Sequence, residues 1–236
     1  IMPSLVGSEM CIRDSPYWED KTISDLASSY MSEKTKECIA NGVFTVGNYF
    51  FGGVGHIIID YDKAIRRGYK AIIQDAVEAL ESFDCNDPDF IQKTQFCKAI
   101  ITVLSAAINF AKRYSDKAKE MAAVETNPTR KAELLQIAAN CEKVPANGAT
   151  NFYEACQSFI ITQMILQVES SGHSESPGRF DQYMYPYLEK DLASGAITKD
   201  FAQELLDCVF VKLNDLNKVR DQISAQAFAG FQVFQN

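Results

Sequence analysis

The sequence has few of the residues that build metal sites. It contains only two histidines, and its seven cysteines include no pair at the spacing of zinc ligands. We therefore predict that this chain binds no metal. The cysteines are odd in number and widely scattered, which is typical of free thiols in a reducing cytoplasm rather than of a disulfide framework.

An excess of positive charge is also missing. The net charge of −8 argues against a nucleic-acid partner, because neutralising phosphates requires clustered Lys and Arg. The longest strongly apolar run, residues 159–166, is interrupted by Thr162 and Gln163 and is too short to cross a bilayer. No signal peptide is evident. We expect a single cytoplasmic domain, or part of one, with neither a membrane nor a nucleic-acid partner.

Apolar residues recur at helical spacing over most of the chain, so a mainly α structure with a few strands is predicted. Asn127 before Pro128 predicts a helix start, and Asn151 with Glu154 resembles a capping box. In the last helix we expect Phe201, Leu205, Leu206, Val209 and Phe210 to face inward. The expected helices cover residues 24–39, 62–83, 89–124, 128–141, 151–168 and 198 onward, and the expected strands cover 43–51, 56–59 and 228–234.

One stretch, residues 172–187, carries an unusual density of polar and aromatic groups. It reads Gly-His-Ser-Glu-Ser-Pro-Gly-Arg-Phe-Asp-Gln-Tyr-Met-Tyr-Pro-Tyr. Such a composition directly after an apolar helix is poorly suited to a plain core and suits the wall of a polar pocket.

The same stretch resembles the signature of the glycyl radical enzymes, the pyruvate formate-lyase family. Similar motifs flank it in the same order: Gly55-His56 leading into residues 60–63 (Asp-Tyr-Asp-Lys), 141–146 (Cys-Glu-Lys-Val-Pro-Ala), 212–221 and 231–236. Together they cover nearly all of residues 20–236. The combination is most similar to the eliminase branch, which includes glycerol and diol dehydratases, choline trimethylamine-lyase and sulfonate lyases.

The resemblance implies the fold and the chemistry of the whole enzyme. The fold would be a ten-stranded β/α barrel wrapped by helices, with radical loops meeting inside. A thiyl radical would remove a hydrogen from the carbon that bears a hydroxyl, and the neighbouring group would leave, as water in the dehydratases. The cofactor would be the protein's own glycyl radical, installed by a separate activating enzyme that uses S-adenosylmethionine and an iron–sulfur cluster. The resemblance further implies an anaerobe, a homodimer, and a place in the cytoplasm or within a bacterial microcompartment.

The motifs that carry the radical in this family do not occur in this sequence. The Gly-Cys-x-Glu loop, with the thiyl cysteine and the base, is absent, and so is the Arg-Val-x-Gly loop of the radical glycine. We therefore predict an N-terminal-side fragment, inactive alone, with no catalytic residue before Asn236. Residues 1–15 resemble translated sequencing adapter, typical of metagenomic reading frames, and residues 16–236 are assigned to the barrel domain. The alternative for residues 1–15 is a genuine N-terminal arm.

Three residues are predicted to bind substrate. His56 follows three glycines, which let the backbone approach a ligand closely. The dehydratases place a substrate-contacting histidine in the matching Gly-His, and a His-Ser pair matching His173 and Ser174 contacts substrate hydroxyls. From the residues alone, His56 could instead be a buried histidine beside a strand, and His173 and Ser174 could belong to a loop that caps the next helix.

Other residues of these motifs receive supporting roles. Phe44, Tyr49 and Phe51 could form an aromatic pocket wall. Arg179 and Asp181 are assigned to structure. Tyr183, Tyr185 and Tyr187 are expected to pack with their hydroxyls anchored by hydrogen bonds.

The predicted substrate is a neutral polyol such as glycerol or 1,2-propanediol. No Asp, Glu, Lys or Arg occurs between Cys38 and Ile59, whereas a sulfonate favours arginine and a quaternary ammonium favours aromatic faces, often with an acid nearby. Choline lyases carry a tyrosine and an aspartate where this chain has Phe44 and Gly52. The alternatives are choline trimethylamine-lyase, formate C-acetyltransferase and, outside the class, a non-enzymatic helical scaffold.

Overall fold

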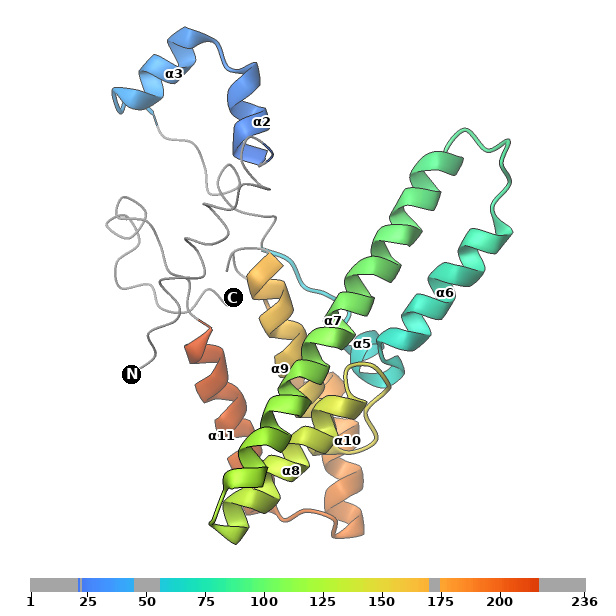
Figure 1. The fold of residues 1–236 in the computed structure, drawn as a ribbon, viewed down its shortest axis with the longest axis vertical. Helices are drawn as coiled ribbons and strands as arrows, with labels where there is room; N and C mark the ends of the chain where they lie inside the picture. Colours follow the sequence, from blue (N-terminus) through green and yellow to red (C-terminus); the bar gives the residue numbers. More distant parts are fainter. Residues whose placement is uncertain (1–20, 22, 45–55, 170–174, 217–236) are drawn as a thin grey trace. The chain divides into compact units, whose positions relative to one another are not determined.

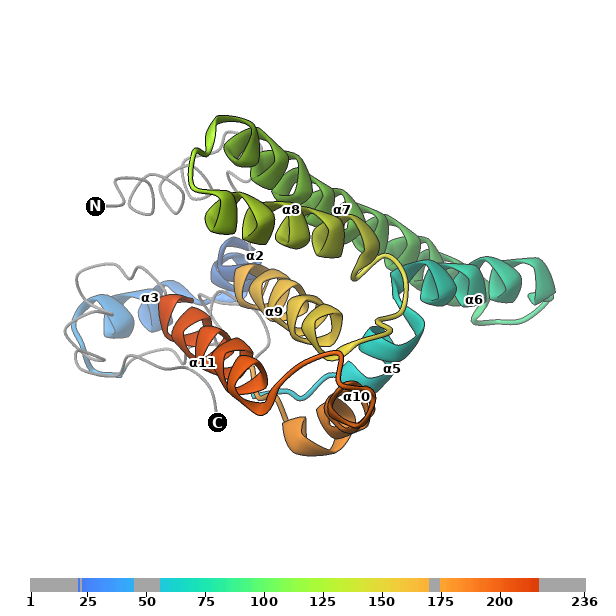
Figure 2. The same cartoon turned by 90° about the horizontal axis from the view of Figure 1, so that it is seen from below.

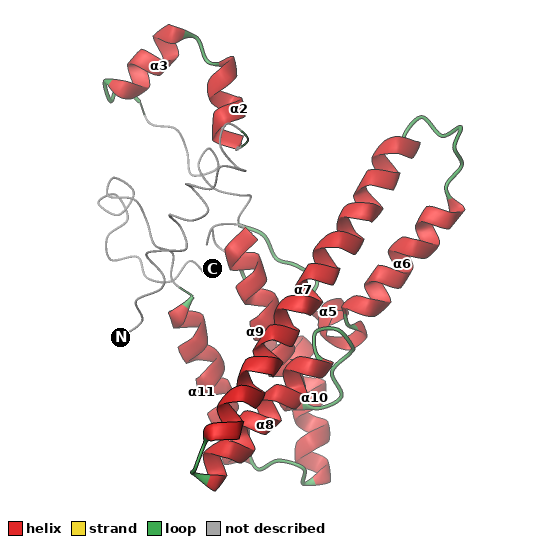
Figure 3. Cartoon of the chain, in the orientation of Figure 1, coloured by secondary structure: helices red, strands yellow, loops and turns green. Residues whose placement is uncertain are grey.

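A computed structural model describes residues 21, 23–44, 56–169 and 175–216. These residues form helices and loops, and the described part of the chain contains no strand (Figure 3). The mainly α content is therefore confirmed. The predicted strand at 56–59 is wrong, because this segment makes only one isolated bridge. Residues 1–15, most of 43–51 and all of 228–234 lie outside the described residues.

The chain divides into two units, each treated by itself. The first comprises residues 1–57, 166–176 and 214–236, and the second comprises residues 58–165 and 177–213. The described helices of the first unit are α2 (Ile23–Tyr30) and α3 (Glu33–Ala40). A single helix was predicted over 24–39, but Ser32 adopts an extended backbone and its hydroxyl accepts the Thr35 N–H at 3.2 Å. This cap starts a second helix.

The second unit holds most of the helical structure. Its helices are α5 (Tyr61–Arg67), α6 (Tyr69–Ser82), α7 (Phe90–Val124), α8 (Pro128–Lys143), most of α9 (Phe152–Glu169), α10 (Phe180–Ser194) and most of α11 (Lys199–Asp215). The long helix α7 packs against α6 along one part of its length and against α8 along the other (Figures 1 and 2).

The core of this unit lies around α9. One cluster joins Ala64 of α5, Tyr69 of α6 and Ala107 of α7, and a second joins Ala111, Cys141 and Ile161 of α7, α8 and α9. Ile165 of α9 packs against both clusters. Most residues of α9 between Phe152 and Gln163 are buried, as expected for a helix that is apolar on all sides.

Helix α7 is the one helix among the described residues that is long and apolar enough to cross a membrane, with a mean hydropathy of 1.3 over its most apolar window. Core helices of soluble proteins pass the same test. A face of α7 packs against α6 and α8, while Ile91, Phe96 and Val103 are exposed.

The helix starts predicted at Asn127 and Asn151 are confirmed. The Asn127 side chain accepts the backbone N–H of Thr129 and of Arg130, and the Asn151 side chain accepts that of Glu154 at 2.8 Å. The capping box is only half formed, because the Glu154 carboxylate binds the backbone N–H of Thr150 instead.

Two further predicted helices depart from expectation. The segment 62–83 is split at Gly68, which has a φ of 74°. In α11 the buried residues are Ala202, Leu205 and Val209, whereas Phe201 and Phe210 are exposed. The inward positions recur every three or four residues, and both phenylalanines fall one step outside that row.

Candidate functional site

The described residues bring together the residues that directly follow the two predicted substrate-binding motifs. Ile57, next to His56, forms a parallel bridge with Glu175, and the Ser176 N–H donates to the Ile57 carbonyl at 3.1 Å. Both segments belong to the first unit at this point. The bridge therefore joins the residue that follows Gly55-His56 to the residue that follows His173-Ser174.

His56 has an exposed side chain and a φ of 55°, in the left-handed region of backbone space. A residue other than glycine adopts this region at an energetic cost, and such residues cluster at binding and active sites. Phe44 is also exposed. The remaining predicted site residues, His173, Ser174, Tyr49 and Phe51, lie outside the described residues, so their common cavity with His56 stays a prediction.

After the bridge, each segment continues to a tyrosine of the second unit: Ile57 is followed by Tyr61, and Glu175 by Tyr183. The rings of Tyr61 and Tyr183 stack, with centroids 5.7 Å apart and 17° between their planes. Phe159 lies 5.1 Å from Tyr61 and 4.9 Å from Phe180, and Phe180 lies 5.7 Å from Tyr183, which closes an aromatic cluster.

The two tyrosine hydroxyls of this cluster donate hydrogen bonds to other groups of the protein. The Tyr183 hydroxyl donates to the Pro177 carbonyl at 2.8 Å, and the Tyr61 hydroxyl donates to the Gln163 side-chain oxygen. Burial raises the pKa of Tyr183 above its ordinary value. Tyr183 is therefore a hydroxyl donor at physiological pH, not a proton acceptor.

The expected hydrogen bonds are confirmed for Tyr183 and for Tyr185, whose hydroxyl donates to Glu189 at 3.0 Å. The expected packing of Tyr185 is wrong, because its side chain is exposed. Arg179 and Asp181 are exposed at the start of α10. Sequence reasoning missed the pairing of Tyr61 with Gln163, because the two residues lie 102 positions apart and no local pattern reports such a contact.

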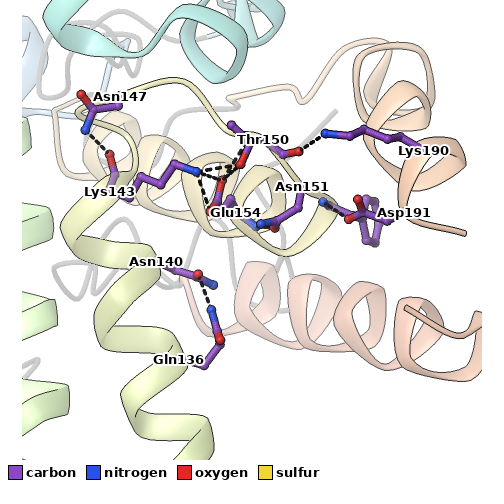
Figure 4. A network of polar contacts seen from close by, with 10 residues as sticks. Gln136, Asn140, Lys143, Asn147, Thr150, Asn151, Glu154, Lys190 and Asp191 are labelled. Carbon is purple, nitrogen blue, oxygen red and sulfur yellow. Dashed lines mark hydrogen bonds and ion pairs between the residues drawn. The ribbon is translucent and has the colours of Figure 1, made fainter. Parts of the chain in front are cut away.

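A second polar network braces the start of α9 (Figure 4). Lys143 Nζ contacts the Glu154 carboxylate at 2.7 Å and the Thr150 hydroxyl at 2.7 Å. Lys190 donates to the Thr150 carbonyl, and the Asp191 carboxylate accepts the Phe152 N–H at 2.7 Å. The network ties α8, α9 and α10 together, so its role is structural.

The described residues include buried thiols but no cluster of potential metal ligands. No group of three or more His, Cys, Asp or Glu in that part of the chain could hold a metal ion. Burial raises the pKa of Cys141 to about 11 and of Cys156 to about 12, so both thiols stay protonated.

Comparison with known proteins defines the class to which this helical arrangement belongs. The family model described as "Pyruvate formate lyase-like" matches residues 8–236. The chain is 38% identical over 208 residues to (2S)-3-sulfopropanediol dehydratase of Klebsiella oxytoca, covering 87% of this chain and 25% of that protein.

Two solved structures have the same fold over almost the whole chain. The B12-independent glycerol dehydratase from Clostridium butyricum, in its glycerol-bound form, gives a TM-score of 0.85 and 51% identity over 97% of this chain and 29% of that one. A structure on 1,2-propanediol dehydration in Roseburia inulinivorans gives a TM-score of 0.86 and 46% identity. It covers 99% of this chain and 28% of that one.

The chain belongs to the pyruvate formate lyase-like family, the glycyl radical enzymes that the sequence motifs predicted. It spans about a quarter of the length of the curated relative described above.

Proposed function

We propose that this chain is part of a glycyl radical eliminase that dehydrates a neutral polyol such as glycerol or 1,2-propanediol. The observation that carries the proposal is the bridge between Ile57 and Glu175, because it lies directly beside both motifs assigned to substrate binding. The two solved structures described above, one with glycerol bound and one on 1,2-propanediol dehydration, support this substrate class.

His56, His173 and Ser174 would bind the substrate hydroxyls. A neutral imidazole offers one donor and one acceptor, and a serine hydroxyl offers both, so the set matches groups that donate and accept at once. Phe44, Tyr49 and Phe51 would form the apolar wall. When the radical is present in the complete enzyme, it supplies hydrogen abstraction; the residues of this chain bind and orient the substrate.

The proposal extends to partners and location. The radical would be installed by a separate S-adenosylmethionine-dependent activating enzyme, and the complete enzyme would be a homodimer in the cytoplasm or in a bacterial microcompartment of an anaerobe. The mostly free, scattered cysteines support a reducing compartment.

A sulfonated diol is the second candidate, since the sulfopropanediol dehydratase is 38% identical to this chain. A sulfonate favours a positively charged partner. The segment that leads to His56, residues 38–59, contains no Lys or Arg, which favours the neutral substrate.

The test uses a complete enzyme that contains this sequence, activated anaerobically and offered glycerol, 1,2-propanediol, choline, isethionate and (2S)-3-sulfopropanediol. We expect preference for a neutral polyol, and His56→Ala should lower kcat/KM by roughly 10- to 100-fold, because a hydrogen bond from the site to the substrate is lost. Tyr30→Ala, at a side chain 84% exposed, is the matched control and should keep full turnover. Preference for choline or a sulfonate, or full diol turnover by His56→Ala, would contradict the proposal.

A further inference from the structure

We infer that Tyr183, stacked on Tyr61, is a positioning residue that holds together the two segments leading to the substrate-binding motifs. The inference rests on the proposed function for the meaning of those segments. Its physical basis is the bridge between Ile57 and Glu175 and a set of contacts among the residues that follow it.

The two segments lie against each other in both units. In the first unit, the bridge joins Ile57 to Glu175 and Ser176. In the second unit, Ile58 lies close to Gly178, because an ideal Cβ on Gly178 would lie 2.8 Å from the Ile58 Cγ2 atom. Residue 58 directly follows residue 57, and Gly178 follows Ser176 by two positions, so a constraint on one contact is transmitted along the backbone to the other.

Tyr183 of helix α10 holds the segment that follows His173-Ser174, residues 175–178. Its hydroxyl donates to the carbonyl of Pro177, which lies in the loop between the bridge and the helix. Pro177 has no backbone N–H, so its carbonyl is the one backbone hydrogen-bonding group through which this residue can be anchored. The Tyr183 hydroxyl donates to that carbonyl and therefore anchors the loop there.

Tyr61 holds the segment that follows Gly55-His56, residues 57–60, and its ring contacts Tyr183. It begins helix α5, four residues after Ile57, and is 2% exposed. Its ring packs on Phe159, and its hydroxyl donates to Gln163, so helix α9 holds it from both the apolar and the polar side. Because the two tyrosine rings stack, movement of one segment displaces the ring that holds the other.

The expected consequence is an effect on substrate binding rather than on chemistry. If the two segments separate part of the time, the binding-competent arrangement is less populated, and the apparent affinity falls by that fraction. Substrate that binds is still held in the correct arrangement. KM should therefore rise while kcat, referred to the radical content, should stay constant.

The experiment compares Tyr183→Phe with Tyr185→Phe in a complete enzyme that contains this sequence. Phenylalanine keeps the stacked ring and removes only the hydrogen bond to Pro177. Tyr185 is a matched control, because it lies on the same helix, is 56% exposed and binds Glu189 through its hydroxyl. Two readouts are used: hydrogen–deuterium exchange at the Ser176 amide, and KM and kcat for glycerol with the radical quantified by electron paramagnetic resonance.

Tyr183→Phe should speed exchange at the Ser176 amide and raise KM, each by about two- to tenfold, the range expected for one lost hydrogen bond. Tyr185→Phe should change neither. Exchange at Ser176 equal in the two variants would overturn the inference whatever the substrate proves to be. Faster exchange with a change in kcat alone would also overturn it. If the enzyme does not turn over polyols but Tyr183→Phe still speeds exchange at the Ser176 amide, the positioning role is supported and only the proposed substrate is refuted.

Discussion

Gly68 lies so close to Asn147 that a Cβ on this glycine would stand 2.3 Å from the Asn147 carbonyl carbon. Around this contact the N–H groups of Tyr69 and Lys70 donate to the carbonyls of Pro145 and Ala146, at 2.7 and 3.0 Å. The loop between α8 and α9 is therefore bonded to the junction between α5 and α6. A side chain at residue 68 would separate these two backbones.

Replacing Gly68 with alanine should destabilise the protein strongly. Alanine would be strained at a φ of 74° and would also collide with the backbone, for a combined loss of roughly 3 kcal/mol. The measurement is the thermal unfolding temperature, read together with hydrogen exchange at the Tyr69 and Lys70 amides. Gly195→Ala is the matched control, since Gly195 has a φ of 71° but nothing within 4 Å of its Cβ position. Equal losses for both variants would contradict a role for the contact.

Gly68 also shows what the sequence could not predict. The apolar repeat continues across residues 62–83 without interruption, so periodicity indicates one helix. The break comes from a contact with a loop almost eighty positions away, which no local pattern reports. Helix starts behave differently: the Asn127 cap involves only the next three residues, and the sequence predicted it correctly.

The candidate site likewise has a part that the sequence predicted and a part that it did not. The motifs located the segments, and the structure places Ile57 beside Glu175, next to the predicted residues. The supporting contacts were not foreseen, because the pairing of Tyr61 with Gln163 depends on how helices α5 and α9 pack. Residue type alone would place a glutamine on the surface, yet Gln163 is fully buried.

Replacing Glu154 with glutamine should weaken the brace at the start of α9 in a pH-dependent way. Burial alone would raise the pKa of Glu154, but hydrogen bonds from Lys143 and Thr150 outweigh it and lower the pKa below the ordinary 4.5. The carboxylate therefore stabilises the fold fully above pH 4.5, and this contribution is lost as the pH falls through the lower folded value. Glu154→Gln should cost roughly 1–2 kcal/mol at pH 7.

The measurement is the unfolding temperature of the original protein and the variant between pH 3 and pH 8. The two curves should converge toward the acid end. Glu120→Gln serves as the control, because its pair with Lys117 is solvent-exposed and such pairs contribute little. A difference between Glu154→Gln and the original protein that grows on acidification would refute this account of the carboxylate.

Alkylation should distinguish the cysteines by burial. With pKa values of about 11 and about 12, Cys141 and Cys156 hold only about a thousandth of their thiols, or less, as thiolate at pH 8. Cys85 and Cys208 are exposed and should react much faster in the isolated 236-residue chain. Peptide mass spectrometry after timed iodoacetamide treatment measures the order. Rapid labelling of Cys141 in the folded chain would contradict the packing of α7, α8 and α9 around it.

The 236-residue chain alone should be catalytically inactive. None of its seven cysteines is followed two residues later by glutamate, and it contains no Arg-Val-x-Gly motif. Its own residues can therefore bind and position a substrate at most, since hydrogen abstraction needs a radical that they do not hold. The test incubates the purified chain anaerobically with an activating enzyme and S-adenosylmethionine, then adds glycerol, 1,2-propanediol or choline. A complete enzyme containing this sequence is the positive control, which shows that activation has worked. Product formed by the isolated chain would mean that one of its own residues carries the radical, and the division between substrate binding here and radical chemistry elsewhere would be wrong.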